Sequence, residues 1–148
     1  NNYLEENFKL RSLDLKLTNQ NAITPVRMQA YERIVVYLER ITPSNMIMRI
    51  HKTGMSSRLL HAELLKTVRG EYDHNIAQQI YMSNASWELV KSAKEEMIKL
   101  INAAAHKVGE NADGVELAKV LLDITMSVEK LPTQIALEYV KKEIRQSF

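Results

Sequence analysis

The chain of 148 residues is long enough for one domain with a single hydrophobic core. Apolar residues make up 45% of it and charged residues 26%, with four glycines and three prolines, a composition typical of an ordered, helix-rich protein. Twenty basic and eighteen acidic residues are interspersed, so the charge gives no electrostatic case for nucleic-acid binding. The lack of cysteine excludes disulfides, thiolate nucleophiles and cysteine-based zinc sites.

The first 23 residues are predicted to be an N-terminal linker segment, and residues 24–148 are predicted to be the helical domain. The larger apolar residues of the linker fall into two sets on opposite sides of a helical wheel: Leu4, Phe8 and Leu15, and Leu10, Leu13 and Leu17. The segment therefore has no single apolar face, and it could be a helix contacted on both sides, by the domain and by a partner or a membrane surface. The alternation of leucine with polar residues near 12–17 equally allows a short strand.

The first helix of the domain is predicted at 25–41. Thr24 would be its N-cap and Pro25 its first residue, where the missing N–H of proline costs nothing. Pro43 ends the helix. The apolar residues that recur every three or four positions along it are Val26, Ala30, Ile34, Leu38 and Ile41. Residues 46–51 follow, and their pattern allows either a short strand or a helical turn.

Three more long helices and a C-terminal helix complete the expected domain, near 57–81, 85–108, 114–130 and from 132 onward. Ser56 or Ser57 is expected to cap the first of them and Asp113 the third, and the second is expected to begin at Asn84 or Ser86. The apolar stripe from Leu60 to Ile80 should meet the stripe from Leu89 to Ala104 in the core. The sequence therefore predicts an all-α, single-domain antiparallel bundle of four main helices plus a C-terminal helix, with a minor β element possible near 12–17 and 46–51.

The sharpest chemical signal is a single Glu-x-x-His pair, Glu71 and His74. In ferritin-like bundles two such pairs and two further glutamates hold a di-metal centre. Because the motif occurs once here, a second copy of the chain would have to supply the other half. A solvated polar face is the main interpretation, and a metal-dependent helical-bundle enzyme using this pair is the alternative. We assign no catalytic, cofactor-binding or metal-binding residue and expect neither a cofactor nor enzymatic activity.

Two other features could contribute to a binding surface. Trp87 could anchor a partner, although a lone tryptophan in a bundle more often belongs to the core or its rim. Met46 and Met48, beside Ile47, could form an adaptable apolar patch.

Four stretches of the chain are similar to an uncharacterised family of short Bacteroidota proteins. They are TPVRMQAYERIVVYLERITP at 24–43, GMS at 54–56, EYDHNIAQQIYMS at 71–83 and WELVKSAKEE at 87–96. The resemblance covers roughly residues 3–105 and implies no assigned activity, and it carries over no catalytic or ligand residue. It implies proteins with one apolar N-terminal membrane helix, a short charged linker and then this domain.

The expected function is a non-enzymatic interaction or scaffold module that binds an unidentified protein partner, could form homo-oligomers and does not bind nucleic acid. No run of eighteen apolar residues is present, and the chain begins without methionine, so we expect that the membrane helix implied by the resemblance precedes it. Lys9, Arg11 and Lys16 would then favour the cytoplasmic face of the inner membrane. A soluble cytoplasmic protein is the alternative.

Overall fold

A computed structural model describes residues 2–147, without the side chains of 19–21, and consists of six α-helices and one 3₁₀-helix, η1. The elements are α1 (Asn2–Arg40), α2 (Pro43–Ile50), α3 (Ser57–Asn75), η1 (Ile76–Tyr81), α4 (Asn84–Val108), α5 (Gly114–Ser127) and α6 (Pro132–Ser147). Between residues 2 and 147 the only β pairing is an isolated bridge between Ser56 and Asp113. The all-α bundle predicted from the sequence is confirmed.

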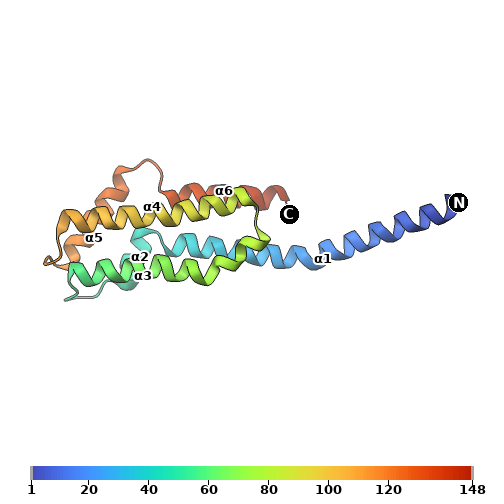
Figure 1. Cartoon of the computed structure of the whole chain (residues 1–148). Coiled ribbons are helices and arrows are strands. Elements are labelled where there is room, and N and C mark those ends of the chain that lie inside the picture. The colour runs from blue at the N-terminus through green and yellow to red at the C-terminus, as the bar shows by residue number, and fades with distance from the viewer. Residues whose placement is uncertain (1, 148) are drawn as a thin grey trace.

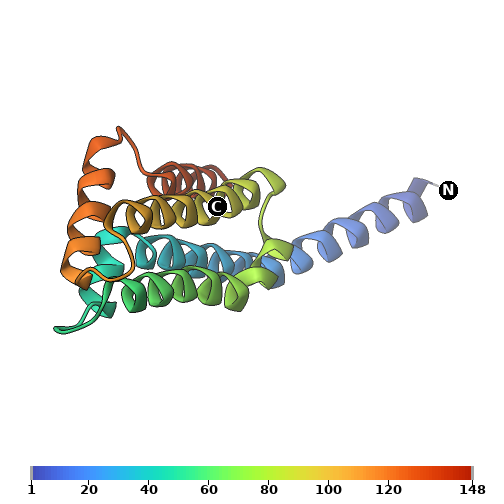
Figure 2. The same cartoon turned by 60° about the vertical axis from the view of Figure 1, so that its left-hand side comes forward.

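Four long helices form the body of the bundle: the C-terminal half of α1, together with α3, α4 and α6. They run antiparallel to their neighbours, and Figure 1 shows α1 continuing well beyond the others toward the N-terminus. Helix α4 packs against α3, α5 and α6, and α1 closes the bundle against α6. Figure 2 shows α5 crossing one end. The C-terminal helix α6, which was expected as an addition to the bundle, is therefore one of its four long helices. Helix α5 covers one end of the bundle.

The predicted meeting of two apolar stripes in the core is confirmed for most of their length. Helix α3 packs along α4, and the ring of Tyr72 stacks on that of Trp87 with 5.5 Å between centroids. The last two members of the first stripe, Ile76 and Ile80, are exposed. They lie in η1, whose three residues per turn break the 3.6-residue period that buries the α3 stripe.

The predicted helix start at Thr24 and Pro25 is wrong, because α1 runs without interruption from Asn2 to Arg40 and Pro25 lies inside it. Proline removes one backbone hydrogen bond from a helix. Pro25 lies on an exposed part of α1, where water can solvate the freed carbonyl group, so the helix continues through it. Val26 is also exposed, since the bundle begins to cover α1 only a few residues later.

Of the two alternatives left open for residues 12–17 and 46–51, a strand or a helix, the structure has the helix in both places. Residues 12–17 belong to α1, and the alternating leucines there lie on two sides of one helix. Residues 46–50 belong to α2, which begins at Pro43, the first helical position that proline favours.

Of the three predicted N-caps, Ser56 and Asp113 are confirmed, and Thr24 is wrong because it lies inside α1. The Ser56 hydroxyl accepts a hydrogen bond from the Leu59 N–H at 3.1 Å, and the Asp113 carboxylate accepts one from the Val115 N–H at 3.1 Å. Helix α4 begins at Asn84, one of the two predicted first residues, and Ser83 is its N-cap. Serine and asparagine both favour N-caps, so composition alone does not select between them.

Candidate interaction surface

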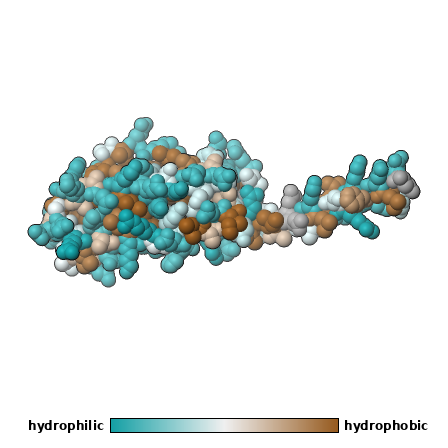
Figure 3. Space-filling view, viewed as in Figure 1, coloured by the Kyte–Doolittle hydropathy of each residue, from teal (hydrophilic) through white to brown (hydrophobic). Residues whose placement is uncertain are grey.

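Residues 2–23 of α1 form a helical arm that projects from the bundle (Figures 1 and 2). With a rise of 1.5 Å per residue the arm is about 33 Å long. Its two sets of apolar residues, Leu4, Phe8 and Leu15 and Leu10, Leu13 and Leu17, are all between 55% and 72% exposed. Figure 3 shows these apolar side chains interspersed with hydrophilic ones along the arm. The arm therefore exposes large apolar side chains on two opposite sides, and both sides are open to contact with other molecules.

More apolar side chains are exposed where the arm meets the bundle, and Figure 3 shows this apolar surface at the junction. They are Ile23, Val26 and Met28 of α1 and Ile76, Ile80 and Tyr81 of η1. Arg27 Nε donates a hydrogen bond to the Tyr81 carbonyl oxygen at 3.2 Å, which ties the base of the arm to η1. Exposed apolar side chains therefore occur on the arm and also at the end of the bundle nearest to it.

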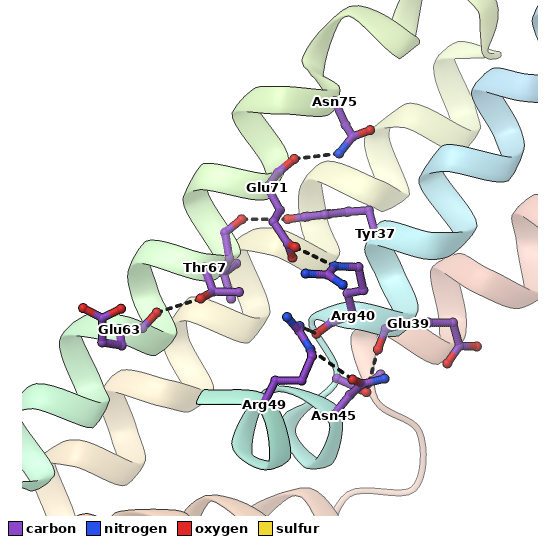
Figure 4. Close-up of polar contacts among 11 residues, drawn as sticks. Tyr37, Glu39, Arg40, Asn45, Arg49, Glu63, Thr67, Glu71 and Asn75 are labelled. Atoms are coloured by element: carbon purple, nitrogen blue, oxygen red, sulfur yellow. Dashed lines mark hydrogen bonds and ion pairs between the residues drawn. The ribbon is translucent and has the colours of Figure 1, made fainter. Parts of the chain in front are cut away.

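A polar groove of about 370 Å³ lies between α1 and α3. At its floor Arg40 Nε donates to Glu71 Oε1 at 2.5 Å, and the Tyr37 hydroxyl donates to the Val68 carbonyl oxygen at 3.0 Å. Arg49 of α2 donates to the Arg40 carbonyl oxygen at 2.6 Å, at the C-terminus of α1 (Figure 4). These contacts join α1, α2 and α3 through polar groups of the chain itself.

The structure places both residues of the Glu-x-x-His pair in this groove. Glu71 is already neutralised by the Arg40 guanidinium, and its second carboxylate oxygen is buried without a hydrogen-bond partner, while His74 is exposed. In the described part of the chain no three His, Cys, Asp or Glu side chains gather as a metal would require. A cation bound at Glu71 would compete with the Arg40 guanidinium for the charge of the same carboxylate.

Burial is the main cause of the pKa shifts of the two tyrosines beside these contacts. It raises the pKa of Tyr37 well above its usual range, and the nearby Glu71 carboxylate raises it further. Burial also raises the pKa of Tyr72, whose ring carries the Lys94 ammonium group 4.1 Å from its centroid. Both phenols therefore stay protonated as donors and packing groups, and neither is set up as a general base.

The other two candidate binding features are placed differently by the fold. Trp87 is 7% exposed and packs on Tyr72, so it is a core residue. Met46 is fully buried whereas Met48 is 86% exposed, so these two methionines do not form one patch.

A family model described as a family of unknown function, DUF7935, matches residues 1–147. This chain belongs to the DUF7935 family. The expectation of an uncharacterised family is confirmed, while the Bacteroidota origin and the preceding membrane helix stay predictions. Comparison of this DUF7935 chain with curated proteins and with solved structures found no match. None of the helices within residues 2–147 has the length and apolar character needed to cross a membrane.

Proposed function

We propose that this DUF7935 chain is a non-enzymatic interaction module, in which the bundle is a folded base and the arm presents apolar side chains to a partner protein. The observation that carries this proposal is the exposure of six large apolar side chains on an arm that the bundle does not cover. Such residues contribute little to the stability of the bundle, and they lower solubility unless another molecule covers them.

The polar groove supports the same proposal. Its carboxylate is engaged by Arg40, its buried tyrosine donates to a backbone carbonyl group, and the amide of Asn75 donates to the Glu71 carbonyl oxygen at 2.8 Å. The first two contacts join α1 to α3, and the third lies within α3. The exposed apolar arm is therefore the better candidate for the working surface.

A site-specific crosslinker tests the proposal in cells. With a photoreactive amino acid at Leu15 of the full-length protein, we expect an adduct with a partner protein, because this side chain is 65% exposed on the arm. The matched control is the same amino acid at Met126, which is 83% exposed on α5 but lies outside the arm. No adduct at Leu15, or equal adducts at both positions, would contradict an interaction role for the arm.

We also propose that the arm connects the bundle to the cytoplasmic face of the inner membrane. The family resemblance supports this location, and so do Lys9, Arg11 and Lys16 along the arm, because lysine and arginine near a membrane segment favour the cytoplasmic side. We expect the full-length protein to fractionate with the inner membrane and the bundle to resist protease added outside spheroplasts. Recovery of the full-length protein in the soluble fraction would contradict this proposal.

A further inference from the structure

The two apolar faces of the arm differ in their relation to the bundle core. Leu10, Leu13 and Leu17 lie three seven-residue repeats before Tyr31, Ile34 and Leu38 respectively. The three bundle residues are fully buried. The leucine face, defined as Leu10, Leu13 and Leu17, therefore occupies the same heptad positions as these buried residues, and Thr24 and Arg27 occupy positions between the two sets. A seven-residue apolar repeat is the pattern of helices that pair side by side.

The leucine face also has room for a second helix. In a straight α-helix a seven-residue repeat drifts by about 20° per repeat, so over three repeats the leucine face turns by about 60° from the face that packs in the bundle. A second helix docked on the leucine face would therefore lie to one side of the bundle that carries this arm. The arm projects clear of α3, α4 and α6, as both ribbon views show.

The charges that flank the leucine face select the occupant. Each seven-residue repeat has two apolar positions, here Leu10 and Leu13. In a parallel pair of helices, the residue just before the first of them faces the residue five positions later in the other helix. Here these residues are Lys9 and Asp14, both exposed and of opposite charge. We propose that the leucine face binds the same face of a second copy of this chain, in parallel and in register, with Lys9 of each copy facing Asp14 of the other.

An antiparallel pair would meet unfavourable charges. An antiparallel pair has two possible registers, depending on which leucines meet. In one register Lys9 of each helix faces Lys16 of the other. In the other register Lys16 faces Lys16 and Asp14 faces Asp14. Like charges in these flanking positions destabilise a pair. The opposite face is a poorer seam for pairing, because Arg11 follows Phe8 and Thr18 follows Leu15 at its core positions. That face therefore lacks three consecutive apolar core positions, which the leucine face has.

This inference rests on the proposed function and deepens it, because pairing uses only one side of the arm. Phe8 and Leu15 point away from the seam of a parallel pair and stay exposed. The pair would therefore present two copies of the outer face, side by side, to the partner protein.

Sedimentation over a range of protein concentrations tests the pairing. We expect a concentration-dependent dimer of the 148-residue chain, and we expect Leu13→Asp to weaken it more than about a hundredfold, because two buried leucines are lost and two carboxylates face each other. The matched control is Leu15→Asp, the same change on the opposite face, which should leave the dimer intact. A chain that is monomeric at every concentration, or equal effects of both variants, would overturn the proposal.

Charge exchange tests the parallel direction. Lys9→Glu and Asp14→Lys should each weaken the dimer by about fivefold, since each converts two exposed ion pairs into repulsions. An equimolar mixture of the two variants should recover the original affinity. In the mixed dimer the introduced glutamate of one chain faces the introduced lysine of the other, and the unchanged Asp14 faces the unchanged Lys9. Stronger association of Lys9→Glu alone would indicate an antiparallel pair and overturn the proposed direction.

Single cysteines separate failure of the pairing from failure of the proposed function, since the chain contains no cysteine of its own. Oxidation should link Leu13→Cys to itself in the parallel dimer, and Leu15→Cys should stay unlinked. A partner adduct at Leu15 with no link at position 13 would overturn the pairing and leave the interaction role standing. A link at position 13 without any partner adduct would support the pairing and contradict the interaction role.

Discussion

Replacing Trp87 with alanine is expected to lower the free energy of unfolding by about 3–5 kcal/mol, the usual cost of emptying a buried tryptophan site. Trp87 is 7% exposed, and its ring stacks on Tyr72 across the contact between α3 and α4. The change removes apolar area and leaves a cavity between the two central helices. Because Trp87 is the only tryptophan, urea unfolding should be followed by far-ultraviolet circular dichroism in place of fluorescence.

Leu15→Ala provides the control for this prediction. It also removes a large apolar side chain, but one that is 65% exposed on the arm, so the stability should change by less than about 0.5 kcal/mol. A similar loss of stability in both variants would mean that the arm folds back on the bundle. A small loss for Trp87→Ala alone would contradict its place in the core.

Replacing Gly114 with alanine is expected to destabilise the bundle by about 1–3 kcal/mol, although alanine normally favours helices. An added Cβ would lie 2.7 Å from the Met55 carbonyl oxygen and 3.3 Å from the ring of His51. The Gly114 N–H donates to the same Met55 carbonyl oxygen at 2.8 Å, so the clash would break the contact that joins the start of α5 to the chain before α3. Urea unfolding measures the effect.

Gly70→Ala is the same chemical change in the middle of α3, and its expected sign is opposite. A Cβ at Gly70 would meet nothing within 4 Å, so alanine should stabilise the chain by up to about 1 kcal/mol through its helix propensity. Destabilisation by Gly70→Ala would indicate a packing role that the structure does not show. An equal stabilisation by Gly114→Ala would contradict the close approach of Met55.

The candidate surface was only partly predictable. The two opposite sets of leucines on the arm were visible in the sequence, but the pattern was equally compatible with a strand and with a helix. Periodicity reports how side chains are spaced, and it does not report whether other elements cover them. The Glu71 and His74 pair was found as well, yet its partner Arg40 lies 31 residues earlier on another helix, where no local pattern points to it.

The sequence by itself determined the helical class, most of the helix positions and two of the three caps, because repeat spacing and hydrogen bonds between a side chain and a nearby N–H are local properties. Only the tertiary structure decided that α6 is one of the four long helices of the bundle, that Trp87 is in the core and that Ile76 and Ile80 are exposed. It also decided that α1 passes through Pro25 and that nearly all the side chains of residues 2–18 are exposed. These outcomes depend on which helices meet, and contacts between residues far apart in the chain decide that.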